Sequence, residues 1–345
     1  MAAAPGAARL LRLLATLAAV LGLGALPPQA VNPYFLQILI LCGINIILAV
    51  GLNLINGFTG QFSIGHAGFM AVGAYLSAAF TFHAGRSWVA VLAGAGLPGG
   101  AAVAAVFLFA LLLGGGAAAL AGLLVGLPTL RLRGDYLAIA TLGFGEIIRV
   151  ILLNIDAVGG ARGFADIPPW SNLTWVLLWT AITVGVVWNL TRSTHGRAFI
   201  AIREDEIAAE ALGIDTTRYK VTAFVVGAFF AGVAGGLFGH YLAYLHTNSF
   251  SFIKSIEVVI MVVLGGMGSI TGSVLAAIVL TLLPEVLRPV KEYRMVIYSL
   301  LLIVLMLSRP QGFLGTRELG LGATGRAIGR ALGRRKPRPA GSMRA

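Results

Sequence analysis

Charged side chains are scarce in this sequence. Of its 345 residues, 58% are hydrophobic and only 11% are charged, and the mean hydropathy is +0.91. A soluble domain of this size needs far more charge to cover its surface, so the composition excludes an ordinary soluble protein. Several apolar runs reach or approach the roughly 20 residues that cross a bilayer as a helix. The sequence therefore predicts an all-α polytopic membrane protein.

Cysteine and lysine are scarce too. The single cysteine, Cys42, excludes a disulfide within the chain. A Walker A loop needs a Gly-Lys pair before Ser or Thr, and no lysine here follows a glycine, which excludes ATP binding by that route. The five histidines lack metal-ligand spacing, and no Gly-x-Ser-x-Gly elbow occurs. We therefore expect no enzyme, and no metal or cofactor bound by this chain.

Basic residues indicate which parts of the chain face the cytoplasm. They occur at Arg131 and Arg133, in the loop 192–220, and from Arg309 onward, where nine Lys and Arg stand against one acid. Lys and Arg flanking membrane spans stay on the cytoplasmic side. The basic tail directly follows a span, so we expect it to meet anionic membrane lipid and not nucleic acid. We expect residues 316–345 to be a disordered cytoplasmic tail.

About ten spans can be drawn from the apolar runs. They are about 10–27, 33–56, 88–107, 108–129, 134–155, 173–191, 220–244, 252–267, 271–288 and 294–308. Residues 1–30 are either a first span or a signal-like segment, because two arginines precede an apolar run there. We favour a retained span, since no A-x-A site follows that run.

The stretch GFTGQFSIGHAGFMAVGAY, residues 57–75, contains five glycines and several polar side chains. If 88–107 and 108–129 are separate spans, then 57–82 cannot cross the membrane fully, and a broken or re-entrant segment is expected. Irregular backbone at membrane depth is tolerated only where protein or water surrounds it. Its polar residues then either face a translocation pathway or serve helix packing. They are Thr59, Gln61, Ser63 and His66.

A second glycine-rich stretch, LGGMGSITGS at 264–273, interrupts the apolar region 252–288. Paired interrupted segments point to a transport site between them. Gly268 and Ser269 are therefore further pathway candidates.

Two ionisable residues lie inside the predicted span 134–155. Glu146 and Arg149 are three residues apart, which places them on one helix face with the acid first. Pairing lowers the cost of carrying either charge in the membrane. A structural ion pair is the favoured interpretation, and a proton or substrate relay is the alternative.

The cytoplasmic loop RSTHGRAFIAIREDEIAAEALGIDTTRYKV is patterned, not merely connecting. Glu206, Ala209 and Gly213 fall on one face of a short helix, and Ala208 keeps its surroundings small. Such a helix can dock in a groove of another protein or lie on the membrane surface.

The pattern formed by Ala208, Ala209, Gly213 and the following isoleucine resembles the loop of ABC-importer permeases that grips the ATPase subunit. Ile207 stands where that pattern expects a glutamate, and Glu206 lies one residue earlier. Four segments in order, GLNLINGFTGQFSIGHAGFMAVGAY, LRLRGDYLAIATLGFGEIIR, RAFIAIREDEIAAEALGID and VVLGGMGSITG, together resemble the M-type permeases of branched-chain amino acid ABC importers.

This resemblance implies an ABC-importer permease fold over residues 31–315, with 192–220 as the coupling loop. It implies a bacterial inner-membrane location with a cytoplasmic C-terminus. The implied partners are a second related permease, two cytoplasmic ATPases that bind ATP and Mg²⁺, and an external solute-binding protein. Leucine, isoleucine and valine are the implied substrates; permeases of this family for urea, short amides or aromatic acids are the alternative. Two alternatives fall outside this family. One is a secondary transporter driven by an ion gradient, which could use Glu146 as a proton site, and the other is a membrane scaffold that transports nothing.

Overall fold

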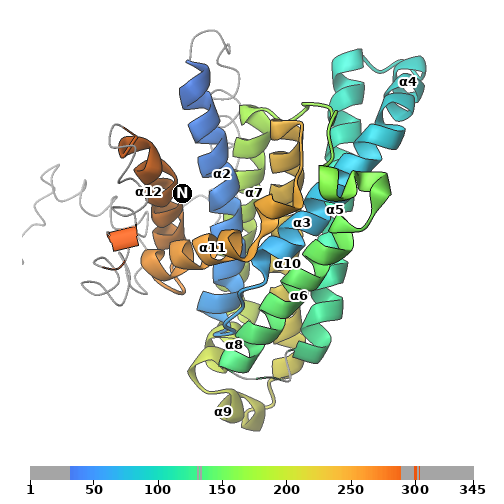
Figure 1. The fold of residues 1–345 in the computed structure, drawn as a ribbon. Helices are drawn as coiled ribbons and strands as arrows, with labels where there is room; N and C mark the ends of the chain where they lie inside the picture. The colour runs from blue at the N-terminus through green and yellow to red at the C-terminus, as the bar shows by residue number, and fades with distance from the viewer. Residues whose placement is uncertain (1–31, 130–131, 133, 289–298, 301–302, 304–345) are drawn as a thin grey trace, which may run out of the picture.

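The computed structural model describes residues 32–129, 132, 134–288, 299, 300 and 303. Among these residues the regular elements are all helices (Figure 1). Seven helical segments are long and apolar enough to cross a membrane, which makes this a multi-pass membrane protein. They are Pro33–Phe58, His66–Gly94, Gly99–Thr129, Asp135–Leu153, Leu173–Thr191, Thr216–Leu242 and Thr247–Gly265.

These segments contain the helices α2 (Pro33–Asn53), α3 (His66–Phe80), α4 (Arg86–Gly94), α5 (Gly99–Thr129), α6 (Asp135–Leu153), α7 (Leu173–Thr191), α10 (Thr216–Leu242) and α11 (Phe252–Gly265). The shorter apolar helix α12 (Ile270–Val286) follows α11. Two short helices, α8 (Thr194–Glu204) and α9 (Glu206–Ala211), lie outside the bundle at one end, at the bottom of Figure 1. We call this the α8–α9 end.

Glycine allows the central helices α3, α5 and α10 to approach very closely. A Cβ atom added at Gly232 of α10 would lie 2.5 Å from the Cβ of Ala118 and 2.8 Å from the carbonyl oxygen of Gly114, both on α5. A Cβ at Gly73 of α3 would lie 2.2 Å from the Cα of Gly232. The small residues of α10 therefore form a packing face, as small residues commonly do between membrane helices.

The prediction that residues 57–82 cannot cross the membrane fully is wrong. α3 continues through a π-helical turn (Thr81–Gly85) into α4, so His66–Gly94 is one 29-residue helix, about 43 Å long at 1.5 Å per residue. The predicted spans 88–107 and 108–129 are likewise wrong, because one helix, α5, covers Gly99–Thr129.

No turn occurs at 107–108, where the two predicted spans were divided, because α5 is continuous there, and the glycine run 114–116 further along is helical too. Gly114 and Gly115 are buried, and added Cβ atoms there would strike α3 and α10. Two crossings therefore still separate α2 from α6, as predicted, but their boundaries differ. The predicted span 10–27 and the tail 316–345 lie outside the described residues, as does the predicted span 294–308 apart from 299, 300 and 303.

Candidate functional site

The helix break that the sequence predicts is real but short. α2 ends in a π-helical turn (Leu54–Phe58), and residues 59–65 are non-helical before α3 begins. Most of this segment is buried, so its backbone needs partners within the protein. The Asn56 side chain supplies two of them: its amide donates to the Ser63 carbonyl and its oxygen accepts from the Ser63 N–H, both at 3.1 Å.

The second glycine-rich stretch forms the turn between α11 and α12. Gly266 and Gly268 have φ values of +102° and +86°, in the region where side chains are disfavoured. Asn53 of α2 holds this turn, because its side chain accepts from the Gly268 N–H and donates to the Ser269 carbonyl, both at 2.9 Å. The structure thus brings together the two interrupted segments, which are more than 200 residues apart in the chain.

Arg203, near the end of α8, reaches the point where the two breaks meet. Its Nη1 donates to the Gly57 carbonyl at 3.1 Å, and a Cβ at Gly268 would lie 2.8 Å from the same nitrogen. The side-chain stem crosses Gly60, where an added Cβ would be 2.9 Å from the Arg203 Cγ. We call the contact of Gly57, Gly268 and Arg203 the junction.

A cavity of about 250 Å³ opens beside the junction at the α8–α9 end. One wall is the non-helical segment, including Thr59 and Gln61, and another is the α8–α9 connection, including Arg203 and Glu206. Thr59 donates to the Ile55 carbonyl at 2.7 Å. Gln61 is only 4% exposed, and neither its amide nitrogen nor its amide oxygen has a partner among the described residues.

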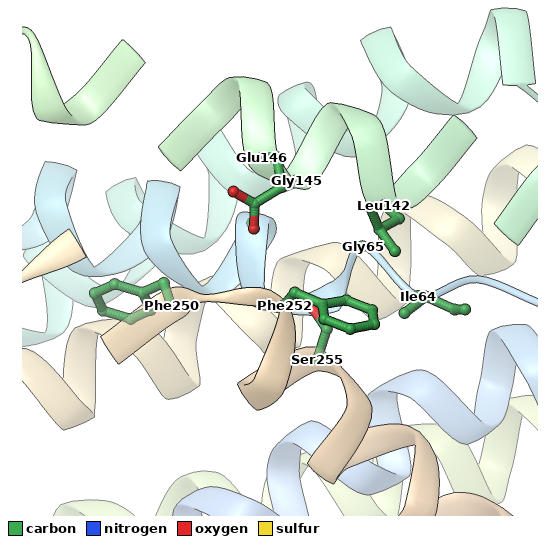
Figure 2. A pocket seen from close by; sticks show the side chains of 9 residues that line it. Ile64, Gly65, Leu142, Gly145, Glu146, Phe250, Phe252 and Ser255 are labelled. Carbon is green, nitrogen blue, oxygen red and sulfur yellow. The ribbon is translucent and has the colours of Figure 1, made fainter. Parts of the chain in front are cut away.

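A much smaller hollow, about 10 Å³, lies at the other end of the same segment (Figure 2). It has room for about one water molecule. The starts of α3 and α11 meet there, because the Ser255 Oγ accepts from the Ala67 N–H at 3.1 Å. Glu146 of α6 points toward this meeting place, and α6 approaches closely because Gly68 and Gly145 face each other. Residues 59–65 therefore run from the larger cavity to this much smaller hollow.

Known proteins match this chain over most of its length. The family model described as branched-chain amino acid transport system / permease component matches residues 34–307. The chain belongs to this permease family. It is 38% identical to the high-affinity branched-chain amino acid transport system permease protein LivM of Salmonella typhimurium, over 79% of this chain and 68% of that protein. No solved structure gives a significant match.

Two further relatives are permease proteins of the same kind of transport system. LivM of Escherichia coli is 37% identical over 86% of this chain and 74% of its own length. The permease protein LivH of Salmonella typhimurium is 32% identical over 47% of this chain and 53% of its own length.

In the permease, Glu146 and Arg149 form an ion pair, with 2.7 Å between the carboxylate oxygen and the guanidinium Nε. The two side chains are 34% and 26% exposed, respectively, on a helix that is itself largely uncovered. Of the two, only Glu146 borders the small hollow.

His66 lies away from the cavity. It is 1% exposed. Its Nε2 lies 3.6 Å from where an added Cβ at Gly51 of α2 would be, and α10 packs against the same glycine. Ser63 is buried as well, and its backbone, not its hydroxyl, makes the contacts with Asn56. Of the four polar candidates in the first break, Thr59 and Gln61 border the open cavity.

The short helix α9 presents a different face from the one that its spacing suggested. Glu206 forms an ion pair with Lys220 of α10 at 2.5 Å, and Ala209 is 2% exposed, so both point toward the permease itself. The outward apolar residues are Ile207 and Leu212, at 68% and 81% exposed, with Ala208 exposed beside them.

The ends of α9 are fixed by local backbone chemistry. The Asp205 side chain caps its start by accepting from the N–H groups of Ile207 and Ala208, at 2.9 and 3.0 Å. Gly213 follows its end with φ +82° and open space around it, as expected of a helix-terminating glycine.

Sequence reasoning missed three residues that hold the site together. Asn53 and Asn56 lie one helical turn apart just before the break, and this spacing of amides in an apolar span was a usable signal. Arg203 gave no such signal, because a single arginine in a charged loop normally faces water.

Proposed function

We propose that this chain is a transmembrane permease subunit of an ATP-driven importer of branched-chain amino acids. The match of residues 34–307 to the permease family carries the proposal, and the names of the LivM and LivH relatives support the substrate class. The two glycine-rich breaks support a transport role, because irregular polar backbone at membrane depth suits a pathway more than a scaffold.

In this proposal the substrate passes beside residues 59–65. The small hollow at Gly65 and Glu146 would be the narrow part of the route on the external side, and the larger cavity at Thr59 and Gln61 the wide part at the α8–α9 end. This difference in volume supports an inward-facing state as part of the proposal. Alternating access would open the hollow and close the cavity by movement of packed helices about this segment.

Coupling to ATP hydrolysis would run through α9 and α8. The exposed apolar side chains Ile207 and Leu212 are suited to dock on a partner ATPase. Movement of α9 would reach the junction through Arg203, which already contacts the first break and lies against the second. The Glu206–Lys220 ion pair ties α9 to α10, so the pull would also reach the bundle.

The remaining parts of the assembly belong to the proposal as well. They are a second, related permease, two cytoplasmic ATPases that bind ATP and Mg²⁺, and an external solute-binding protein. The bacterial inner membrane is the proposed location, with the α8–α9 end and the C-terminus in the cytoplasm. This orientation places the five Lys and Arg of the loop 192–220 on the side that retains such residues; the loop's equal number of acidic residues does not alter the rule, which counts Lys and Arg and not net charge.

The first experiment is gentle isolation of the C-terminally tagged chain from native membranes, followed by mass spectrometry. We expect two P-loop ATPases and a second hydrophobic permease to accompany it. Proteoliposomes containing that complex, supplied with its binding protein and ATP, should accumulate leucine, and competition with urea, acetamide or phenylacetate then tests the alternative substrates. A chain that is recovered alone and transports without ATP would overturn the proposal in favour of a secondary transporter.

A further inference from the structure

The open cavity combines both kinds of surface that a free amino acid needs. Its size, about 250 Å³, is slightly below the range of about 300–1,000 Å³ typical of pockets for larger ligands. Part of its lining is apolar, contributed by Phe62, Leu132, Leu137 and Ile202. The polar part comes from the first break, from the α8–α9 connection and from Lys220 of α10.

Gln61 is the residue that points to a ligand, although its amide is sealed from the cavity in this arrangement and a turn of the side chain would have to present it. Nearly every buried amide in a protein is hydrogen-bonded, because leaving its donor and acceptor unpaired costs free energy. Here both atoms of the Gln61 amide are buried without a partner among the described residues, and the residue borders the cavity. A free donor beside a free acceptor matches the carboxylate and the ammonium of an α-amino acid.

The charged rim is compatible with the same ligand. Arg203 pairs with Glu204 at 2.6 Å, and Lys220 pairs with Glu206 at 2.5 Å. Both ion pairs border the cavity. A rim with charges of one sign would favour ligands of the opposite net charge. A rim with both signs suits a zwitterion, which carries one charge of each sign.

The geometry points to a product site: the cavity binds a free branched-chain amino acid from the cytoplasm, and the bound amino acid slows the next transport cycle. Such a ligand would contact Gln61 on the first break and the residues around Arg203 on α8. A ligand that binds one arrangement of these two walls more tightly opposes any step that changes their spacing. This inference rests on the proposed function, which supplies the amino acid and the cycle.

The test uses the complete complex in lipid nanodiscs, without binding protein or nucleotide, and radiolabelled leucine as the probe. We expect saturable binding that leucine amide and 4-methylpentanoate compete for poorly, because each lacks one charged group. Gln61→Leu should weaken leucine binding about tenfold, the cost of about 1.4 kcal/mol for lost polar contacts. The matched control is Gln37→Leu, since Gln37 is exposed near the opposite end of α2.

A labelling experiment keeps the inference testable if Gln61→Leu folds poorly. The one natural cysteine, Cys42, is buried and can be replaced by alanine. In that background, Leu132→Cys places a thiol in the cavity lining, and Thr194→Cys places one on the exposed start of α8. Millimolar leucine should slow maleimide labelling of the first thiol several-fold and leave the second unchanged.

The regulatory part is read from ATP hydrolysis. Leucine added on the cytoplasmic face should lower the ATPase rate of the wild-type complex, and the Gln61→Leu complex should resist this inhibition. Equal leucine affinity in the Gln61→Leu and Gln37→Leu complexes, or unchanged labelling of Leu132→Cys, would overturn the inference. If the complex imports leucine but shows equal affinities or unchanged labelling, the product site is refuted and the proposed function stands. If the complex imports no leucine at all, the proposed function is refuted.

Discussion

Replacing Arg203 should separate ATP hydrolysis from transport. The guanidinium joins α8 to the Gly57 carbonyl at 3.1 Å, and its stem lies across Gly60. Arg203→Ala removes this link but leaves the outward face of α9 intact. We therefore expect the complex to keep hydrolysing ATP while importing less leucine per ATP.

The size of the effect follows from the bond that is lost. A hydrogen bond from a charged donor contributes about 1.5–3 kcal/mol. Because the Arg203 side chain is 27% exposed, solvent screens it and the lower value applies. A loss of about 1.5 kcal/mol corresponds to about a tenfold fall in the ratio of transport to hydrolysis. Arg203→Lys should fall in between, since one ammonium replaces a planar group with several donors.

The assay measures leucine uptake and phosphate release in the same proteoliposomes. Arg197→Ala is the matched control, because Arg197 is an exposed arginine on the same helix. Glu204→Gln tests the neighbouring ion pair, whose carboxylate is 68% exposed and should contribute little. If Arg203→Ala and Arg197→Ala give the same ratio of transport to hydrolysis, the junction does not couple the two processes.

Three further substitutions test other parts of the molecule. Gly213→Val forces a branched side chain into φ +82°, at a cost of about 1–2 kcal/mol. We expect it to uncouple ATP hydrolysis from leucine uptake without unfolding the permease. Unchanged coupling would exclude α9 as the docking helix. Gly232→Leu should abolish the monodisperse peak in detergent gel filtration, because the added atoms meet helix backbone, whereas Gly116→Leu, with no atom within 4 Å of an added Cβ, should keep it. Glu146→Gln should keep ATP-driven uptake within about fivefold, since partly exposed ion pairs contribute about 1 kcal/mol or less, and loss of a proton-driven component would instead favour the secondary transporter.

Several spans could be predicted from the sequence because an apolar run is a local property. The predicted spans 134–155 and 173–191 agree closely with α6 and α7. The break after α2 was also readable, since glycines and polar side chains interrupt the apolar run there. The family could be recognised for a similar reason, because its motifs are contiguous stretches of sequence.

Only the tertiary structure decided what each glycine does. Glycine both frees the backbone to turn and lets another helix come close, and a glycine run by itself does not say which of the two it does. In the fold, Gly114 lies inside α5 against α3, while Gly268 turns the chain with φ +86°. The choice depends on which helix packs against each glycine, and that neighbour can be more than a hundred residues away in the chain. The same long-range packing places Arg203 at the junction.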